Sequence, residues 1–438
     1  MPGEIVSLHL GGAGNTIGNE LWSRFYTEFA DKAGEHSTGL AGPVGSTGAP
    51  SFFYESERGS LCPRCIFIDS NIHLGVYVEP ECQIALRQDC RSNFFEGISQ
   101  WKGGASDRIV EGIRVQTERC DALSGFLLFH SLSGGTGSGI GVESNRFLRD
   151  EFPKQVILDH IIYPSKDSSN SVVGPYNTVF GLTQAHKQSS VSFLLDNQAA
   201  FRICREKRGI LNPSYSHMNE IIADLISMVT SSLRGRTTLN ASLNEILTNL
   251  VPEPDFHYPI VSYAPLGQKR VSPSTRELVS SLFRPSSTFC DVPNIDAGRF
   301  FAASILCRGQ GGLSVPEIIK SLSSMRATSG KFVPWIPNSF KVGVVEHCAL
   351  KTGVEAEAVL IANSTSVRDL FDREYKKVLH LLFHKAFVWQ YLEAGAEMDD
   401  FIQSRETMKS IISRYDETLT EIKSCESSKL RTELNSLS

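Results

Sequence analysis

The chain has 438 residues, and 43 Lys and Arg against 48 Asp and Glu leave a formal charge of -5. At roughly 100 to 200 residues per domain, this length predicts two or three domains and excludes a disulfide-stabilised miniprotein. The mild negative charge argues against nucleic acid as a partner. No stretch approaches the roughly 18 apolar residues that span a bilayer, so we expect a cytoplasmic protein without membrane insertion.

Short apolar runs recur through the first half of the chain and alternate with segments of helical spacing. The runs have the length of buried strands and cover 5–10, 65–68, 126–130, 156–163 and 192–195. Helical spacing is found, for example, over 17–29 and 141–152. Strands and helices in alternation predict a parallel sheet covered on both faces. Residues 33–51 are rich in Gly, Ser and Pro and are expected to form a surface loop.

The second half of the chain predicts a different organisation. Residues 216–234 have apolar positions at helical spacing and are predicted to form a long helix that connects two domains. The strand-like runs 300–307 and 340–345, mixed with shorter helices, indicate a second α/β domain. Two amphipathic segments, 366–391 and 398–422, are expected to form an outer helical layer.

Cys62 and Cys65 form the one C-x-x-C motif of the chain. No second pair follows at the spacing of a zinc ribbon, and the other cysteines are scattered. We therefore interpret both as small buried apolar residues and not as a metal or redox site.

Two glycine-rich turns carry the strongest chemical signal. The first apolar run leads into GGAG at 11–14, and the run 126–130 leads into SGGTGSG at 133–139; a helical segment follows each. Glycines leave the backbone N–H groups at a helix start open, and such a nest binds anions, phosphate above all. Neither a Walker A lysine nor a G-x-G-x-x-G fingerprint is present. Because the carboxyl ends of parallel strands meet at one edge, the two turns are expected to converge.

Together these motifs resemble the tubulin superfamily. The matching segments occur in family order and at family spacing, at 11–18, 133–139, 175–177, 196–198 and 249–252. The resemblance implies an α/β fold that begins with a parallel-sheet GTP-binding domain over 1–215. A core helix over 216–234, a second α/β (intermediate) domain over 235–365 and a C-terminal helical layer over 366–438 would follow. The implied ligand is GTP or GDP, and the implied partners are other tubulins or copies of this chain, in longitudinal and also lateral contact.

The resemblance assigns the nucleotide to both glycine turns and to two later segments. Thr136 would add a hydroxyl contact to the phosphate loop, Asn197 and Asn219 would read the guanine edge, and Tyr215 would stack on the base. Amides pair a donor and an acceptor with guanine, and a flat ring covers its face. The nucleotide-binding residues predicted in this way are Gly11, Gly12, Ala13, Ser133, Gly134, Gly135, Thr136, Gly137, Ser138, Asn197, Tyr215 and Asn219.

Several positions depart from the family pattern at the phosphates and the ribose. Gly12 stands where the family has a glutamine, and Gly174 stands where an acid touches the ribose. Asn71 replaces an acid two residues beyond Asp69, so that Asp69 is left as the candidate that holds Mg²⁺ through a water. The other departures are Ile-Ser-Gln at 98–100 for G-N-N and Ser133 for the first glycine of the signature. Magnesium binding is therefore left open.

Hydrolysis in the family is completed in trans, by acids that the next subunit places against the terminal phosphate. The matching segment 239–246 offers Ser242 and Glu245, which are three residues apart and are expected to share a helical face. Ser242 stands where alpha-type tubulins have an acid and cannot accept a proton as a carboxylate would, whereas Glu245 could orient or deprotonate water. We expect Glu245 to act on a partner's nucleotide, with weak or absent turnover. Two alternatives stay open: an active GTPase that forms dynamic polymers, and a nucleotide-free scaffold that keeps the fold.

Some features differ from ordinary alpha and beta chains. The last residues are nearly neutral, 341–363 has a beta-like length, and 265–278, which matches the lateral-contact loop, is several residues short. Three short phrases look most like the epsilon group and its relatives, including zeta, at 151–153, 243–246 and 391–393. This resemblance implies association with microtubule-based structures and their proteins at the centriole, basal body or cilium.

Overall fold

The computed structural model describes most of the chain. The described residues are 3–33, 49–56, 60–165, 171–235, 237, 239–266, 274–292, 298–309, 313–324, 332–336, 340–345 and 354–436, with the backbone alone at 30–33, 49–50 and 426–436. Most of the surface loop predicted at 33–51 and half of the lateral-contact segment at 265–278 lie outside the described residues.

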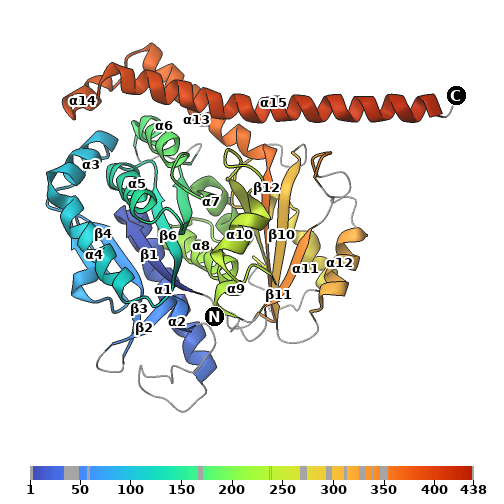
Figure 1. Cartoon of the computed structure of the whole chain (residues 1–438), viewed down its shortest axis with the longest axis horizontal. Coiled ribbons are helices and arrows are strands. Elements are labelled where there is room, and N and C mark those ends of the chain that lie inside the picture. The colour runs from blue at the N-terminus through green and yellow to red at the C-terminus, as the bar shows by residue number, and fades with distance from the viewer. Residues whose placement is uncertain are drawn as a thin grey trace.

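A six-stranded parallel sheet forms the first domain, in the order β5-β4-β1-β6-β7-β8 (Figure 1). Its strands are β1 (Glu4–Leu10), β4 (Cys65–Asp69), β5 (Gln83–Ala85), β6 (Leu123–Ser131), β7 (Val156–Tyr163) and β8 (Val191–Asp196). The five predicted strands are confirmed. Almost every strand residue is buried, because helices cover both faces, and the strands therefore form continuous apolar runs in the sequence. A small hairpin, β2 (Phe53–Glu55) with β3 (Leu61–Pro63), lies beside this sheet. Cys62 and Cys65 are buried in β3 and β4, and burial raises the pKa of both thiols.

The two faces of this sheet pack against different helices. The helices of the domain are α1 (Gly11–Ala33), α2 (Ala49–Phe52), α3 (Phe94–Gln100), α4 (Ser106–Glu118), α5 (Gly141–Glu151), α6 (Gly174–Ala185) and α7 (Asn197–Glu206). Apolar side chains of α1 share one core with those of α8 (Tyr215–Val229), and α4 and α5 contribute to the core of the opposite face. The prediction of a single helix over 216–234 is wrong in one detail. The chain turns at Thr230 before α9 (Ser231–Arg234), since the Thr230 and Ser231 hydroxyls bond to carbonyls of the preceding turn.

The intermediate domain is a mixed four-stranded sheet in the order β11-β10-β12-β9. Its strands are β9 (Pro259–Ala264), β10 (Phe300–Gly309), β11 (Lys341–Val345) and β12 (Ala356–Ser364), and its helices are α10 (Leu243–Leu250), α11 (Thr275–Leu282) and α12 (Val315–Ser323). The predicted second α/β domain is therefore confirmed.

The C-terminal helices lie across one side of the molecule, as predicted (Figure 1). They are α13 (Arg368–Phe383), α14 (Val388–Glu393) and α15 (Met398–Ser436). The prediction of one helix over 366–391 is wrong, because Lys385 and Phe387 adopt left-handed backbone angles (φ 50° and 60°) that end α13 and start α14. The helix α15 is longer than predicted and continues beyond the body of the protein.

A row of five rings crosses the parallel sheet, one from each of β4, β1, β6, β7 and β8; the first four are stacked and the fifth is tilted. In this order the rings belong to Phe67, His9, Phe129, His160 and Phe193, with neighbouring centroids 4.6, 4.7, 4.5 and 5.2 Å apart. Burial lowers the pKa of His9 to about 3 and that of His160 to about 4, so both rings are neutral at neutral pH. The indole N–H of Trp22 donates to His9 Nε2 (3.0 Å), which fixes α1 over the sheet.

A buried group of charged side chains joins the two α/β domains. Arg308 of β10 lies between Glu28 of α1 (Nη1–Oε1, 3.2 Å) and Glu357 of β12 (Nη2–Oε2, 2.6 Å). Arg234 of α9 and Arg24 of α1 also contact Glu28. Burial alone would raise the pKa of Glu28, but the three guanidiniums hold it at about 2. The helix α1, which begins with the first glycine turn, is thus anchored to the intermediate domain.

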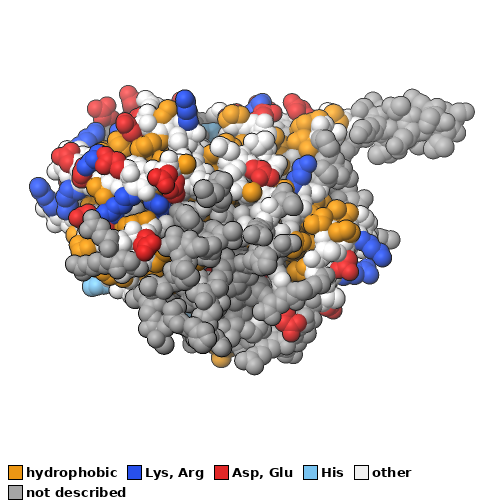
Figure 2. Space-filling view, turned by 60° about the horizontal axis from the view of Figure 1, so that its bottom comes forward, with side chains coloured by type: hydrophobic (Ala, Val, Ile, Leu, Met, Phe, Trp, Pro, Cys, Tyr) orange, Lys and Arg blue, Asp and Glu red, His pale blue; other side chains and the backbone are white. Residues whose placement is uncertain are grey.

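Acidic and basic side chains are interspersed over the described part of the face in Figure 2. Within the described residues, no helix is long and apolar enough to cross a membrane.

Candidate functional site

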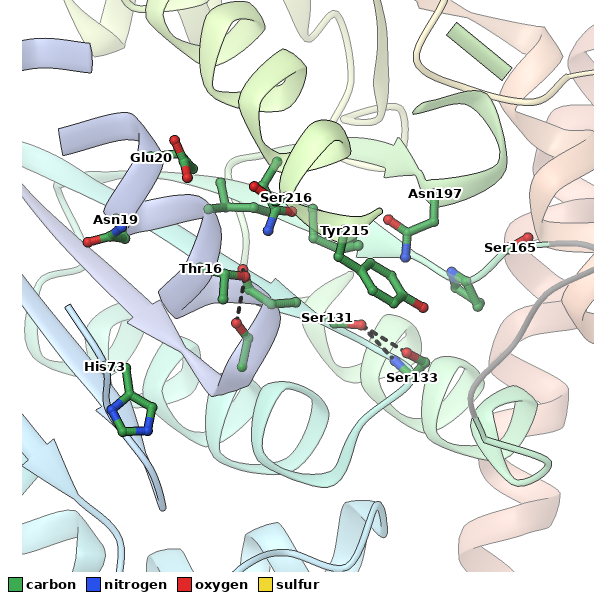
Figure 3. Close-up of a pocket in the computed structure, with 16 residues that line it drawn as sticks. Thr16, Asn19, Glu20, His73, Ser131, Ser133, Ser165, Asn197, Tyr215 and Ser216 are labelled. Atoms are coloured by element: carbon green, nitrogen blue, oxygen red, sulfur yellow. Dashed lines mark hydrogen bonds between the residues drawn. The ribbon is translucent and has the colours of Figure 1, made fainter. Parts of the chain in front are cut away.

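A cavity of about 540 Å³ opens at the carboxyl edge of the parallel sheet (Figure 3). This volume falls in the usual range of sites for small molecules, roughly 300 to 1,000 Å³. The lining residues are Gly12, Ala13, Thr16, Ile17, Asn19, Glu20, His73, Ser131, Ser133, Ile162, Pro164, Ser165, Asn197, Tyr215, Ser216 and Asn219.

Half of the predicted nucleotide residues line this one cavity. They are Gly12 and Ala13 on α1, Ser133 after β6, Asn197 on α7, and Tyr215 and Asn219 on α8. Residues that are up to 207 positions apart in the chain therefore meet, as expected for loops that leave the carboxyl ends of parallel strands. The contacts that each residue makes with a nucleotide stay a prediction.

The glycines of the second turn have packing roles that the sequence did not indicate. A Cβ atom at Gly139 would lie 2.3 Å from the carbonyl oxygen of Phe94, at the start of α3. One at Gly137 would lie 2.4 Å from the carbonyl oxygen of Ser131, at the end of β6. At Gly134, by contrast, no atom lies within 4 Å of the added Cβ. The turn therefore needs glycine mainly where helix, turn and strand backbones touch, and only Gly134 is open.

The two glycine turns also pack against each other. Gly11 has a left-handed backbone (φ +73°), and a Cβ there would lie 3.2 Å from the amide nitrogen of Gly137. The side chains of Thr136 and Ser138 are buried in the turn, and the Ser138 hydroxyl donates to the carbonyl oxygen of Gly134. The predicted residues that do not line the cavity are Gly11, Gly134, Gly135, Thr136, Gly137 and Ser138. Apart from Gly134, which is partly exposed, these residues are buried and form the packed layer of the two turns.

Asn177 joins the parts of the cavity around the two glycine turns, which is its predicted phosphate end. Its Nδ2 donates to the carbonyl oxygens of Ser133 (2.9 Å) and Ser92 (2.7 Å). Its Oδ1 accepts from the backbone N–H of Phe94 (3.0 Å) and from the hydroxyl of Tyr391 in α14 (2.7 Å). This fully buried amide thus joins the second glycine turn, α3 and the C-terminal layer. The motif at 175–177 pointed to Asn177, but its partners lie too far along the chain to be inferred from spacing.

The predicted base end of the cavity, around Asn197 and Tyr215, is built on capped helices. Asp196 caps α7 by accepting from the backbone N–H of Gln198 (2.8 Å), and this places Asn197 in the first turn. Arg373 of α13 pairs with the same carboxylate (3.0 Å). The base end is therefore also tied to the C-terminal layer, here through charge.

Tyr215 begins α8, directly after its cap. Ser214 and His217 form a reciprocal cap, with the backbone N–H of Ser214 donating to His217 Nδ1 (3.1 Å). The ring of Tyr215 is half exposed and projects into the cavity, between Asn197 and Ser216 (Figure 3). An exposed flat ring at this place can cover the face of a base.

Asp69 lies beside the first glycine turn without lining the cavity. A Cβ atom at Gly12 would be 3.8 Å from Asp69 Oδ2. Burial raises the pKa of Asp69, and the backbone N–H of Ser70 donates to its Oδ1 (2.8 Å). The described residues contain no group of three or more His, Cys, Asp or Glu that could hold a metal ion. Mg²⁺ at nucleotide sites uses waters, phosphate oxygens and one or two carboxylates, so Asp69 fits the role of a single protein carboxylate.

Glu245 lies at the opposite edge of the parallel sheet from the cavity. Leu243, the first residue of α10, comes within 2.8 Å of a Cβ built at Gly125, near the start of β6, whereas Ser131 at the end of β6 lines the cavity. At about 3.3 Å per residue the six steps between these strand positions span roughly 20 Å.

The prediction that Ser242 shares a helical face with Glu245 is wrong, because Ser242 has an extended backbone and caps α10 (Glu245 N to Ser242 Oγ, 3.2 Å).

Several lining residues were not predicted from the sequence, although two kinds of signal in it point to them. Thr16, Asn19 and Glu20 follow the first glycine turn at helical spacing, and α1 begins at Gly11 instead of near residue 17. His73 and Ser165 follow the strands β4 and β7, as carboxyl-edge residues do. Ser131 and Ser216 are neighbours of predicted residues.

The fold and the cavity define a nucleotide-binding α/β protein. Residues 4–205 match the model of the Tubulin/FtsZ family, GTPase domain, and residues 254–375 match that of the tubulin C-terminal domain. The chain is 33% identical over 448 residues to the tubulin alpha-A chain of Neurospora crassa, covering 95% of this chain and 97% of that one. It is 34% identical over 436 residues to the tubulin alpha-3 chain of Saccharomyces cerevisiae, covering 94% and 97%. The chain belongs to the tubulin family and is a GTP-binding cytoskeletal subunit of that family.

Proposed function

We propose that this chain binds GTP or GDP in the cavity at the carboxyl edge and associates longitudinally with other tubulins or with copies of itself. One observation carries the proposal: side chains from α1, the second glycine turn, α7 and α8 meet around a single cavity, in the arrangement that the family resemblance implied. Lateral association is also proposed; residues 267–273 of the matching segment lie outside the described residues.

Magnesium is part of the proposed phosphate end. Asp69 would hold the ion through a water, and the bound ion would neutralise charge on the phosphates. Asn71 is exposed and offers an amide oxygen in place of a carboxylate. We therefore expect weaker dependence on Mg²⁺ than a site with two acids would show.

We further propose that any hydrolysis occurs in trans and is slow. Glu245 lies roughly 20 Å of sheet away from the cavity of its own chain, so it can reach a nucleotide only across a subunit contact. Its Oε2 already accepts from the backbone N–H of Ala241 (2.9 Å), which ties part of the carboxylate to the helix cap. Ser242 provides a cap but no second negative charge.

Association with centrioles, basal bodies or cilia is proposed from the sequence alone. It depends on the short phrases at 151–153, 243–246 and 391–393. The relatives reported above are alpha tubulins and give no support for an epsilon or zeta affiliation. A fluorescently tagged chain that follows cytoplasmic microtubules and is absent from these structures would contradict it.

Nucleotide extraction from the gently purified protein tests the main proposal. We expect GTP or GDP at close to one molecule per chain, and no guanine nucleotide would favour the nucleotide-free scaffold instead. Phosphate release with and without alpha/beta-tubulin then measures turnover. Brisk release by the wild type would favour the active GTPase.

The variant pair Ser242→Asp and Ser242→Asn tests the assignment in trans. Both residues are good helix caps, so α10 should remain intact in each. Only the aspartate restores the second acid, and we expect it alone to speed phosphate release during assembly. Equal rates for the two variants would contradict the role of the charge at this position.

A further inference from the structure

An acid that the predicted nucleotide residues do not include lines the base end of the cavity. Glu20 lies on α1, one helical turn beyond Thr16 and on the same helical face. Figure 3 shows Glu20 on the Ser216 side of Tyr215, while Asn197 lies on its other side. Asn219, one turn beyond Ser216 on α8, also lines the cavity. The helices α1 and α8 pack side by side, so these groups form one wall.

The Glu20 carboxylate has no hydrogen bond or ion pair within the described part of the chain. The acids around it are paired, because Arg208 contacts both Glu220 (2.9 Å) and Asp224 (2.9 Å). Burial, followed by the nearby charges of Glu220 and Asp224, raises the pKa of Glu20. A partly buried carboxylate without a donor, beside two other acids, is well suited to accept N–H groups from a ligand.

We infer that Glu20 determines base specificity by accepting the N1–H and 2-amino hydrogens of guanine beside Asn219. This inference rests on the proposed function, since it places the base at Tyr215 with its N1–H and 2-amino edge toward α1 and α8. Guanine presents two adjacent N–H donors on this edge, which match the two oxygens of a carboxylate. Hypoxanthine lacks the 2-amino group, and adenine presents an acceptor at N1 that a carboxylate repels. Xanthine has a carbonyl oxygen at C2, which a carboxylate also repels.

The test is the affinity of the full-length chain for GDP, IDP and XDP, measured by displacement of a fluorescent GDP analogue. The wild type should bind GDP more tightly than IDP. Hydrogen bonds to charged groups contribute roughly ten-fold to a hundred-fold in affinity. Glu20→Ala should therefore weaken GDP binding by about ten-fold or more and IDP binding much less, so that the ratio of the two affinities falls.

Glu20→Gln gives a second readout that a structural role would not produce. The amide offers a donor to the C2 carbonyl of xanthine, so this variant should bind XDP more tightly than the wild type does while GDP binding weakens. If Glu20→Ala binds GDP too weakly to be measured, the ratio of the GDP and IDP affinities can be measured in Glu20→Gln instead. The matched control is Glu220→Gln, which removes a nearby acid that does not line the cavity and should leave the GDP to IDP ratio unchanged.

The outcomes separate the inference from the proposed function. Unchanged GDP to IDP ratios in Glu20→Ala, with GDP still bound, would overturn the role of Glu20 and leave the proposed function intact. A ratio that also falls in Glu220→Gln would overturn it, since general electrostatics would then explain the effect. Failure of the wild type to bind GDP at all would overturn both.

Discussion

The two ends of the cavity differ in composition, because backbone groups form one end and side chains form the other. The phosphate end consists of backbone: two glycine turns contact each other, β6 and α3, and the buried amide of Asn177 fixes their carbonyl groups. The base end consists of side chains on α1, beyond its glycine turn, and on the first turns of α7 and α8, with Tyr215 half exposed. Each end is tied to the C-terminal layer, through Tyr391 at the phosphate end and Arg373 at the base end.

This difference predicts which substitutions change the stability of the fold and which change nucleotide binding alone. At the phosphate end, recognition and folding use the same atoms, so most changes should disturb stability together with binding. At the base end the helices are capped independently of the ligand-facing side chains, so changes there should alter binding with little effect on folding. The departures at Gly12 and Ser133 fit this view, because both positions line the cavity and neither belongs to the packed glycine layer of the two turns.

Asn177→Ala should give the largest effect. It removes four buried hydrogen bonds and leaves the N–H of Phe94 and the hydroxyl of Tyr391 without their partner. We expect a loss of about 3 to 5 kcal/mol in the free energy of unfolding, together with loss of nucleotide binding. Chemical denaturation followed by circular dichroism measures the first. Tyr391→Phe removes only one of these bonds and should cost about 1 kcal/mol; equal losses in the two variants would contradict the central role of Asn177.

Gly139→Ala should come next. Its added methyl group would lie 2.3 Å from the carbonyl oxygen of Phe94, so α3 or the turn must move. Overpacking of this kind costs about 1 to 3 kcal/mol, and we expect the upper end because the clash is with backbone. Gly134→Ala is the matched control in the same turn, since its methyl group meets no atom within 4 Å. Similar melting temperatures for the two variants would show that the packed glycine layer is less tight than described.

Acidification should weaken the parallel sheet beneath the phosphate end. The folded-state pKa values of His9 and His160 are lowered to about 3 and about 4, so between these values and 6.5 the unfolded chain binds more protons than the folded one. The stability that comes from keeping these two histidines neutral is therefore fully present above pH 6.5, and it is lost as the pH is lowered. At pH 5 each histidine should account for a loss of about 2 kcal/mol. Urea unfolding at pH 7 and pH 5 measures the loss.

His160→Phe isolates one of these contributions. The substitution keeps a ring between Phe129 and Phe193 and removes the titrating group. The loss between pH 7 and pH 5 should then be smaller by about 2 kcal/mol than in the wild type. An unchanged loss would place the acid sensitivity elsewhere, for example at the buried His257, whose pKa burial lowers to about 3.

The contrast between the two ends also explains what the sequence could predict. Fully buried parallel strands leave continuous apolar runs, and β1, β4, β6, β7 and β8 were predicted for that reason. Base-end residues such as Asn197 and Tyr215 could be identified because each would contact the base through its own side chain, and the type of that side chain can be recognised in the sequence. The packing roles of Gly137 and Gly139 could not be predicted, since they depend on backbones that approach from distant parts of the chain. The break after α13 was missed because Lys385 and Phe387 have no turn signature and adopt left-handed angles through tertiary contacts.

Tyr215→Ala should change binding with the smallest effect on the fold. Stacking of an aromatic side chain on a base is worth about 1 to 3 kcal/mol, so guanine nucleotide should bind roughly ten-fold or more weakly. Because the ring is half exposed and the cap of α8 is formed by Ser214 and His217, the free energy of unfolding without nucleotide should change by less than about 0.5 kcal/mol. Tyr215→Phe keeps the flat ring and should bind nearly as well as the wild type. If Tyr215→Ala instead destabilised the protein as Asn177→Ala does, the base end would be part of the folding core, and the distinction between the two ends of the cavity would not hold.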